Sequence, residues 1–185
     1  MLTRASRARI EKDGYVLNIN ISGRNGVPSP GVYREAGKCG NLPSGEAYIA
    51  PLEDGSDGEM IIDGSMVGIG KLESPLHMTI SGGKLRSVTG EKSENLDILL
   101  KNEINGTVCE LGIGTNEAAI LNGIILEDEK YMELFISPLV PTLLLAEQTK
   151  QNAIWMESSC VRLYIWMIQK LSKTEFFLSD LFLNR

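Results

Sequence analysis

No glycine follows Gly123 in this chain of 185 residues, although the sequence contains 19 glycines. Folded domains normally use glycine in their turns, so the glycine-free residues 131–185 lack the composition of a second domain. Histidine is nearly absent too, because His77 is the only one. It has no cysteine, histidine or carboxylate nearby at ligand spacing, and we interpret it as a structural or exposed residue rather than a metal ligand.

Cysteine is also scarce. Cys39, Cys109 and Cys160 are odd in number and share no spacing typical of metal or redox sites, which fits a reducing cytoplasm. The net charge is −6 and no cluster of Lys or Arg occurs, which argues against a nucleic-acid partner. The first 13 residues are polar and no apolar run is long enough to span a bilayer. We therefore expect a cytoplasmic protein without a signal peptide or a membrane association.

Short strands dominate the pattern of residues 14–126, which predicts a strand-rich α+β fold with few helices. Residues 15–21, for example, alternate between apolar and polar side chains, the period of a half-buried strand. A short helix is expected to begin at Ser93 and to carry Leu96, Leu99 and Leu100 on one face. The expected strands are 15–21, 47–50, 59–63, 76–80, 84–88 and 107–109, with 76–80 and 84–88 joined as a hairpin.

The segment Asn41-Leu-Pro-Ser-Gly-Glu-Ala-Tyr-Ile-Ala-Pro51 places one carboxylate at a structural junction. Its turn residues deliver Glu46 onto the start of a short apolar strand, which Pro51 ends. A carboxylate held there can be fixed rigidly and still reach a cleft, as a metal ligand or general base must. The alternative is a solvated Glu beside a turn.

A second segment, Glu110-Leu-Gly-Ile-Gly-Thr-Asn116, repeats this arrangement. The strand 107–109 brings Glu110 to a turn expected at Gly112-Ile-Gly114. Because Glu46 and Glu110 occupy matching positions, we predict that their carboxylates lie close enough to share a site. The acidic triplet 127–129 is a weaker candidate, because adjacent acids point in different directions and usually form a solvated turn.

These two segments are similar to the sequence of a known enzyme family. The first resembles the Asn-Leu-Pro-x-Gly-Glu-Val-x-x-x-Pro segment of the aminopeptidase T-like leucyl metalloaminopeptidases, and the second is a further string of that family. The resemblance implies a hydrolase, a protease that removes N-terminal residues from peptides with two divalent metal ions (zinc, cobalt or manganese). It implies Glu46 and Glu110 as metal ligands and a peptide substrate. A homodimer is a candidate assembly. The resemblance covers residues 1–130 in order, as part of the family's C-terminal domain.

The resemblance stops at Lys130, where the family would continue with Gly-Thr-Val-His and later His-x-Asp. A shift of one nucleotide restores part of this pattern. Codons that can encode Met132 to Val140, when they are read in the shifted frame, encode Gly-Thr-Val-His-Ile-Ala-Phe-Gly. Further on, the shifted frame reaches a stop codon across Ser179 and Asp180. We therefore interpret residues 131–185 as a frameshifted tail and not a domain. The alternative is a genuine helical tail whose apolar face binds a partner.

The sequence accordingly predicts a fragment of a metal-dependent aminopeptidase that is inactive as written. Only Glu46 and Glu110 remain of the family's ligands, and two carboxylates without imidazole hold a divalent ion weakly. Met1 falls where the family's C-terminal domain begins. Two alternatives stay open: a domain like that of a mononuclear iron dihydroxypyridine dioxygenase, which metal identity would distinguish, and a non-enzymatic interaction module.

Restoring one nucleotide after the Lys130 codon is expected to give a shorter tail, better solubility and tighter metal binding, because the family's His and His-x-Asp return. Soluble yield, thermal melting and bound metal of the two versions provide the measurement. If the chain as written melts cooperatively with Trp155 and Trp166 buried, and the repaired version gains nothing, the tail is a genuine structural element.

Overall fold

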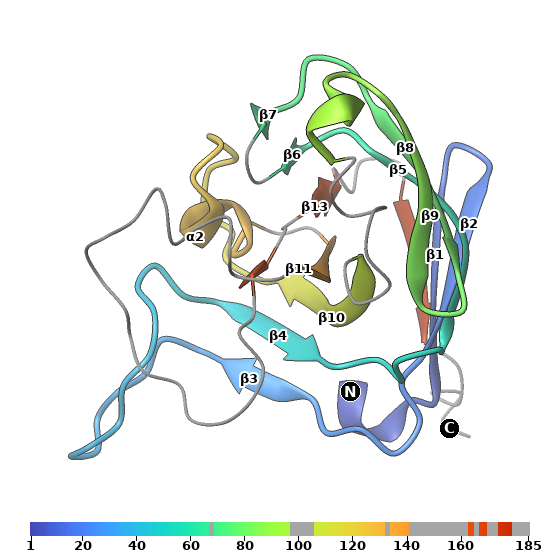
Figure 1. The fold of residues 1–185 in the computed structure, drawn as a ribbon. Coiled ribbons are helices and arrows are strands. Elements are labelled where there is room, and N and C mark those ends of the chain that lie inside the picture. The colour runs from blue at the N-terminus through green and yellow to red at the C-terminus, as the bar shows by residue number, and fades with distance from the viewer. Residues whose placement is uncertain are drawn as a thin grey trace.

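The computed structural model of the chain describes residues 1–66, 69–96 and 106–131, together with the backbone of four short strands further on. Strands dominate it, and helix is limited within these residues to η1 (Leu2–Arg4), η2 (Ser93–Leu96) and α2 (Ile125–Asp128) (Figure 1). The predicted strand-rich fold with few helices is therefore confirmed.

Fourteen strands belong to one hydrogen-bonded sheet. Up to residue 71 they are β1 (Arg7–Lys12), β2 (Tyr15–Asn20), β3 (Val27–Ser29), β4 (Glu46–Ile49), β5 (Ser56–Ile62), β6 (Ser65–Met66) and β7 (Gly70–Lys71). The later strands are β8 (Leu76–Ser81), β9 (Lys84–Gly90), β10 (Thr107–Gly114), β11 (Leu134–Val140), β12 (Leu163–Tyr164), β13 (Met167–Gln169) and β14 (Thr174–Leu178).

The main path through the sheet runs β14-β1-β2-β5-β8-β9-β10-β11-β13-β6-β7, and each of these pairs is antiparallel. The end of this path returns close to β5, because β6 follows β5 in the chain after only Asp63 and Gly64. The sheet therefore curves around its interior (Figure 1). On one side, β4 pairs with β10 and β3 pairs with β4, which extends the sheet below the curved part.

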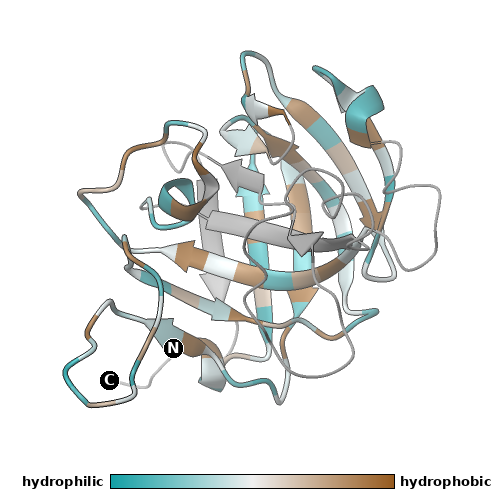
Figure 2. Cartoon of the chain, turned by 60° about the vertical axis from the view of Figure 1, so that its left-hand side comes forward, coloured by the Kyte–Doolittle hydropathy of each residue, from teal (hydrophilic) through white to brown (hydrophobic). Residues whose placement is uncertain are grey.

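The hydrophobic core lies on the inner face of this curved sheet. Strand alternation explains which residues reach it, since Leu17 and Ile19 of β2 and every second side chain of β8 from Leu76 are apolar and buried. Figure 2 shows the resulting bands of apolar residues along the strands. Fully buried members of this cluster include Leu17, Ile21, Ile49, Ile62, Leu76, Met78 and Leu111.

Most strand predictions are confirmed. The expected strands at 15–21, 47–50, 59–63, 76–80, 84–88 and 107–109 correspond to β2, β4, β5, β8, β9 and the first part of β10. Strand β1 was not expected as a strand, and its partner β2 follows it across a turn in which Asp13 and Gly14 both have positive φ, 50° and 86°. The helix expected from Ser93 is a 3-10 helix as far as Leu96, and Leu99 and Leu100 lie outside the described residues.

The turn predicted at 112–114 is wrong. Strand β10 continues through Gly112 to Gly114, so Glu110 lies inside a strand and not at its end. The physical reason is that these glycines serve packing rather than turning, because β4 and the chain around Tyr131 lie against them.

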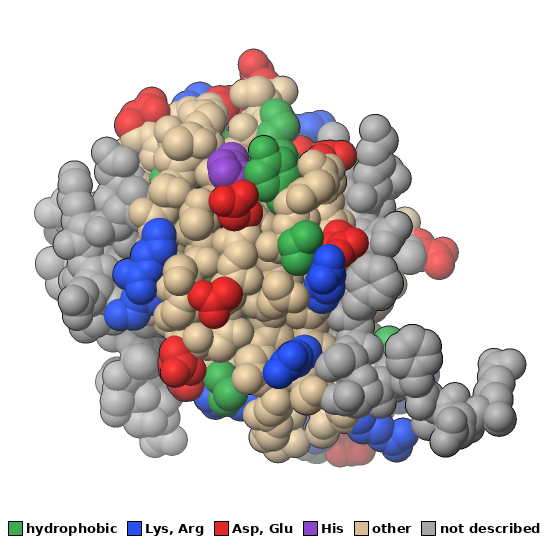
Figure 3. All heavy atoms as spheres, turned by 90° about the vertical axis from the view of Figure 1, so that its right-hand side faces the viewer, with side chains coloured by type: hydrophobic (Ala, Val, Ile, Leu, Met, Phe, Trp, Pro, Cys, Tyr) green, Lys and Arg blue, Asp and Glu red, His purple; other side chains and the backbone are tan. Residues whose placement is uncertain are grey.

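His77 has a structural environment, as predicted. Its ring lies 4.7 Å from the ring of Tyr15, centroid to centroid, and its Nε2 lies 3.4 Å from Oε2 of Glu59. The histidine is visible beside acidic side chains on the surface in Figure 3. In the described part of the chain, no helix has the length and apolar character needed to cross a membrane.

Segments beyond residue 130 take part in the sheet, since β11 pairs with β10 and β14 pairs with β1. The domain boundary at residue 130 and the frameshifted origin of residues 131–185 stay predictions.

Replacing Leu111 by Ala is expected to lower the free energy of unfolding by about 2–5 kcal/mol, because its side chain is fully buried and would leave a cavity. Leu42→Ala is the matched control, since Leu42 is 69% exposed and should change stability by less than about 0.5 kcal/mol. Urea denaturation of both variants measures this. Equal losses would contradict the position of β10 against the core.

Candidate functional site

The two segments that carry the candidate glutamates pair with each other. Strand β4 runs antiparallel to β10, with Glu46 opposite Gly114 and Tyr48 opposite Gly112. Just beyond these strands, the Thr115 amide donates to the Gly45 carbonyl over 2.8 Å. The Asn116 side-chain amide donates to the Ser44 carbonyl over 2.9 Å. Residues far apart in the sequence therefore form one local unit.

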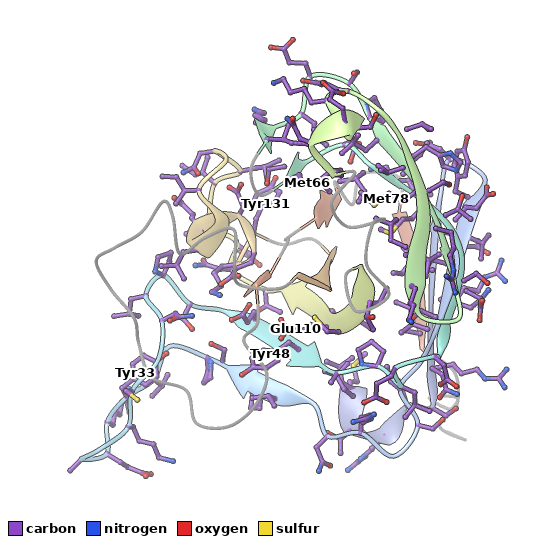
Figure 4. All side chains as sticks on the ribbon, in the orientation of Figure 1. Tyr33, Tyr48, Met66, Met78, Glu110 and Tyr131 are labelled. Atoms are coloured by element: carbon purple, nitrogen blue, oxygen red, sulfur yellow. The ribbon has the colours of Figure 1, made fainter. Side chains whose placement is uncertain are left out.

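Strand alternation separates the two faces of this unit. Its core face carries Ala47 and Ile49 of β4 and Leu111 and Ile113 of β10. The opposite face carries Glu46, Tyr48 and Glu110, because side chains two residues apart point to the same side of a strand. Figure 4 labels Tyr48 and Glu110 on the two adjacent strands.

Both predicted ligands thus lie on the same face, but not directly opposite each other. Glu46 faces Gly114, and Glu110 lies four residues earlier along β10, which is about 13 Å at the rise of a strand. Glycine is the residue at both 112 and 114, so no side chain of β10 projects into the space between the two glutamates. Their assignment as ligands of a shared metal stays a prediction.

Gly45 and Gly114 allow the chain to pack closely around Glu46. A Cβ at Gly45, whose φ is +111°, would come within 2.9 Å of the Asn116 Cβ. A Cβ at Gly114 would overlap the Tyr131 carbonyl oxygen. Because only glycine permits these approaches, the backbone at residues 130 and 131 crosses directly over Gly114. This crossing brings Lys130 to Glu46.

Lys130 forms a buried ionic cluster with two carboxylates. Its Nζ lies 2.6 Å from Oε1 of Glu46, and it also donates to Oε1 of Glu129. Lys130 is 0% exposed, Glu129 is 4% exposed and Glu46 is 8% exposed. A buried ammonium needs such partners, because an unpaired charge in the interior costs several kcal/mol. Among the residues that the structure describes, the second oxygen of Glu46, Oε2, is buried and has no hydrogen-bond partner.

Burial also changes the acidity of Glu129. Desolvation raises the pKa of its carboxyl group to about 7, although the hydrogen bond from Lys130 and the charge of Lys130 act in the opposite direction. The negative charge of Glu46 raises the pKa of Glu129 further. Glu129 therefore gains and loses its proton close to neutral pH.

Asp128 anchors the chain just before this cluster. It accepts a hydrogen bond of 2.7 Å from the Ser65 hydroxyl, and the backbone amides of Asn122 and Gly123 donate to its two oxygens. The acidic triplet was predicted to be a solvated turn, and this is wrong for Asp128 and Glu129. They are buried because α2 and the following turn fold back onto β6 and β10, where specific donors compensate for the burial.

Sequence reasoning missed Lys130 as a residue of this site. Apolar side chains usually indicate burial and charged side chains exposure. Here the order is reversed, because Ile124 and Leu126 are 62% and 40% exposed while Asp128 and Glu129 are buried. Glu46, one of the two partners of Lys130, lies 84 residues earlier in the chain, so no local sequence pattern predicts this contact. Across the described ranges, no group of three or more His, Cys, Asp or Glu side chains is arranged to hold a metal ion.

Comparisons with known proteins identify the fold. No family model matches the sequence, and no curated protein matches it. The solved structure of 2,5-dihydroxypyridine dioxygenase from Pseudomonas putida KT2440 is similar, with a TM-score of 0.71 and 16% identity, over 97% of this chain and 53% of that one. Wild-type AmpT, an aminopeptidase T from Thermus thermophilus, is similar with a TM-score of 0.62 and 15% identity, over 94% of this chain and 45% of that one.

Both similarities are distant in sequence and establish a shared fold. The chain spans about half the length of each of these proteins. The predicted relationship to aminopeptidase T is therefore confirmed at the level of structure, and the dioxygenase named as an alternative shares the same fold.

The raised pKa of Glu129 predicts how stability depends on pH. The unfolded chain loses this proton near pH 4.5 and the folded chain near pH 7, so the unfolded state binds fewer protons between these values. The contribution of Glu129 to the free energy of unfolding should then fall as pH rises through this window, by on the order of 3 kcal/mol.

Glu129→Gln removes the ionisable group and should flatten that part of the pH profile. Urea denaturation at several pH values between 4.5 and 7.5 compares the variant with the unmodified chain. The exposed Glu73 provides a control, since Glu73→Gln should keep the original slope. An unchanged slope in Glu129→Gln would contradict the burial of its carboxyl group.

Proposed function

We propose that this chain is part of a metal-dependent hydrolase of the aminopeptidase type, with Glu46 and Glu110 as carboxylate ligands. One observation carries the proposal: the two segments that resemble the leucyl metalloaminopeptidases pair as β4 and β10 and place both glutamates on one face. The fold shared with AmpT supports it. The substrate would be a peptide, and the ions would be two divalent metals such as zinc, cobalt or manganese.

The surroundings of Glu46 suit a metal ligand. Its backbone is fixed in β4 and its Oε1 is held by Lys130, while its buried Oε2 has no hydrogen-bond partner within the described part of the chain. A buried oxygen of this kind is satisfied when it binds a cation. In this class of site, two divalent ions polarise the scissile carbonyl and supply a hydroxide nucleophile. Glu46 and Glu110 would hold and orient these ions, and the neighbouring core would keep both strands rigid.

The chain as written is expected to have negligible activity on its own. Its only histidine, His77, lies on β8 with Glu59 and Tyr15 as neighbours, and no histidine follows it in the sequence. An active metal centre needs a complete and well-supported set of ligands. The imidazole ligands that the resemblance implies are missing.

A second candidate function is ring cleavage by a dioxygenase of the 2,5-dihydroxypyridine type. The higher TM-score and wider coverage of that structure favour it. The two candidates differ in their metal, because the dioxygenase would use one iron ion. They also differ in their substrate, a dihydroxypyridine ring rather than a peptide.

Metal binding by substituted chains tests the proposal. Glu46→Gln and Glu110→Gln should each weaken binding of zinc, cobalt or manganese at least tenfold, since each removes one charged ligand. Equilibrium dialysis followed by elemental analysis measures the bound metal. Glu117→Gln, at an exposed glutamate close in sequence to β10, is the matched control and should leave binding unchanged.

Activity assays distinguish the candidates. The purified chain should release no leucine from a leucyl substrate with any of these metals. Clear metal-dependent release would contradict the expected inactivity. Selective binding of iron(II), together with oxygen consumption in the presence of 2,5-dihydroxypyridine, would favour the dioxygenase over the peptidase.

A further inference from the structure

The buried cluster of Glu46, Glu129 and Lys130 has the composition of an occupied cation site. Two carboxylates from different parts of the chain converge on one positive group, the Lys130 ammonium. All three side chains are more than nine-tenths buried. When both carboxylates are ionised, the cluster holds two negative charges and one positive charge. In the described ranges Glu46 Oε2 also has no hydrogen-bond partner, so these residues do not saturate the cluster with donors.

We propose that Glu46 and Glu129 form a cation site whose affinity Lys130 lowers by placing its own ammonium group there, so that a divalent ion binds more tightly when Lys130 is removed. The inference rests on the proposed function only in so far as both involve Glu46. Lys130 lowers the affinity of Glu46 for a metal ion without abolishing it, because an ion on Glu46 Oε2 would lie within a few ångströms of the ammonium and be repelled by it.

The geometry favours a cation site over a purely structural ion pair. A structural Lys–Glu pair needs one carboxylate, whereas here two are desolvated around one ammonium. Asp128, the next acid in sequence, is already satisfied by Ser65 and two backbone amides, so it anchors the segment without competing for the cation. Glu46 and Glu129 are thus the two carboxylates available to the ion.

The ion expected is a hard divalent cation. Both protein ligands are carboxylates, and oxygen-only sites prefer manganese, calcium or magnesium to metals that favour imidazole or thiolate. Manganese is a convenient probe because its free and bound forms differ in electron paramagnetic resonance.

The experiment compares manganese binding by the unmodified full chain and by Lys130→Met. This substitution removes the ammonium and keeps a long apolar side chain. Lys130→Met should bind one manganese ion per chain at least tenfold more tightly than the unmodified chain, and manganese should raise its melting temperature. If Lys130→Met is unfolded without metal, because two buried carboxylates have lost their counter-ion, added manganese should restore a cooperative melting transition.

Five control variants locate the effect. Lys130→Arg retains the positive charge and should gain no affinity, and neither should Lys92→Met, which removes a partly exposed lysine beside Glu91. Adding Glu46→Gln or Glu129→Gln to Lys130→Met should abolish the gained binding. The triple variant of Glu46→Gln, Glu129→Gln and Lys130→Met contains no charge at the site, so it should be stable without metal and insensitive to manganese.

The outcomes separate this inference from the proposed function. Adding Glu110→Gln to Lys130→Met should leave the gained site intact, whereas the proposed function requires Glu110 for metal binding by the unmodified chain. Failure of the peptidase proposal therefore leaves this prediction standing. The inference is overturned if Lys130→Met shows no gain in manganese affinity and no stabilisation by manganese, or if the gain survives the loss of both Glu46 and Glu129.

Discussion

The antiparallel pairing of β4 with β10 is the constraint on which the site depends. It fixes one face of the two strands against the core through Ile49 and Leu111, and it turns Glu46, Tyr48 and Glu110 to the other face. Gly114 then permits the backbone at Tyr131 to cross the strand in direct contact. Without that crossing, Lys130 would not reach Glu46, and the buried carboxylate would have no counter-ion.

The ionic cluster shows how burial and charge are balanced in this fold. Removing a carboxylate from water is costly, and the ammonium of Lys130 offsets that cost for two carboxylates at once. The compensation is incomplete, since the pKa of Glu129 is raised to about 7 and Glu46 Oε2 has no hydrogen-bond partner among the described residues. Residues left in this condition are found more often at functional sites than elsewhere, because a ligand or ion can complete them.

A common fold does not by itself decide between the two candidate chemistries. The neighbouring structures are a dioxygenase and an aminopeptidase, both at or below 16% identity. Function resides in the side chains that a fold presents, and the same framework can present different metal ligands. The face shared by Glu46 and Glu110 is therefore the place where the two functions would diverge.

The sequence by itself predicted six of the strands and singled out the two glutamates. Local patterns were enough for several strands: alternation of apolar and polar residues predicted β2, a short apolar run predicted β5, and the turn at residues 81–83 predicted the β8–β9 hairpin. The segments around Glu46 and Glu110 were recognisable from their resemblance to two sequence strings of the leucyl metalloaminopeptidases. What only the tertiary structure decided is the register that sets Glu46 opposite Gly114, the strand character of Gly112 and Gly114, and the burial of Glu129 and Lys130. These features depend on contacts between residues far apart in sequence, so the local sequence does not predict them.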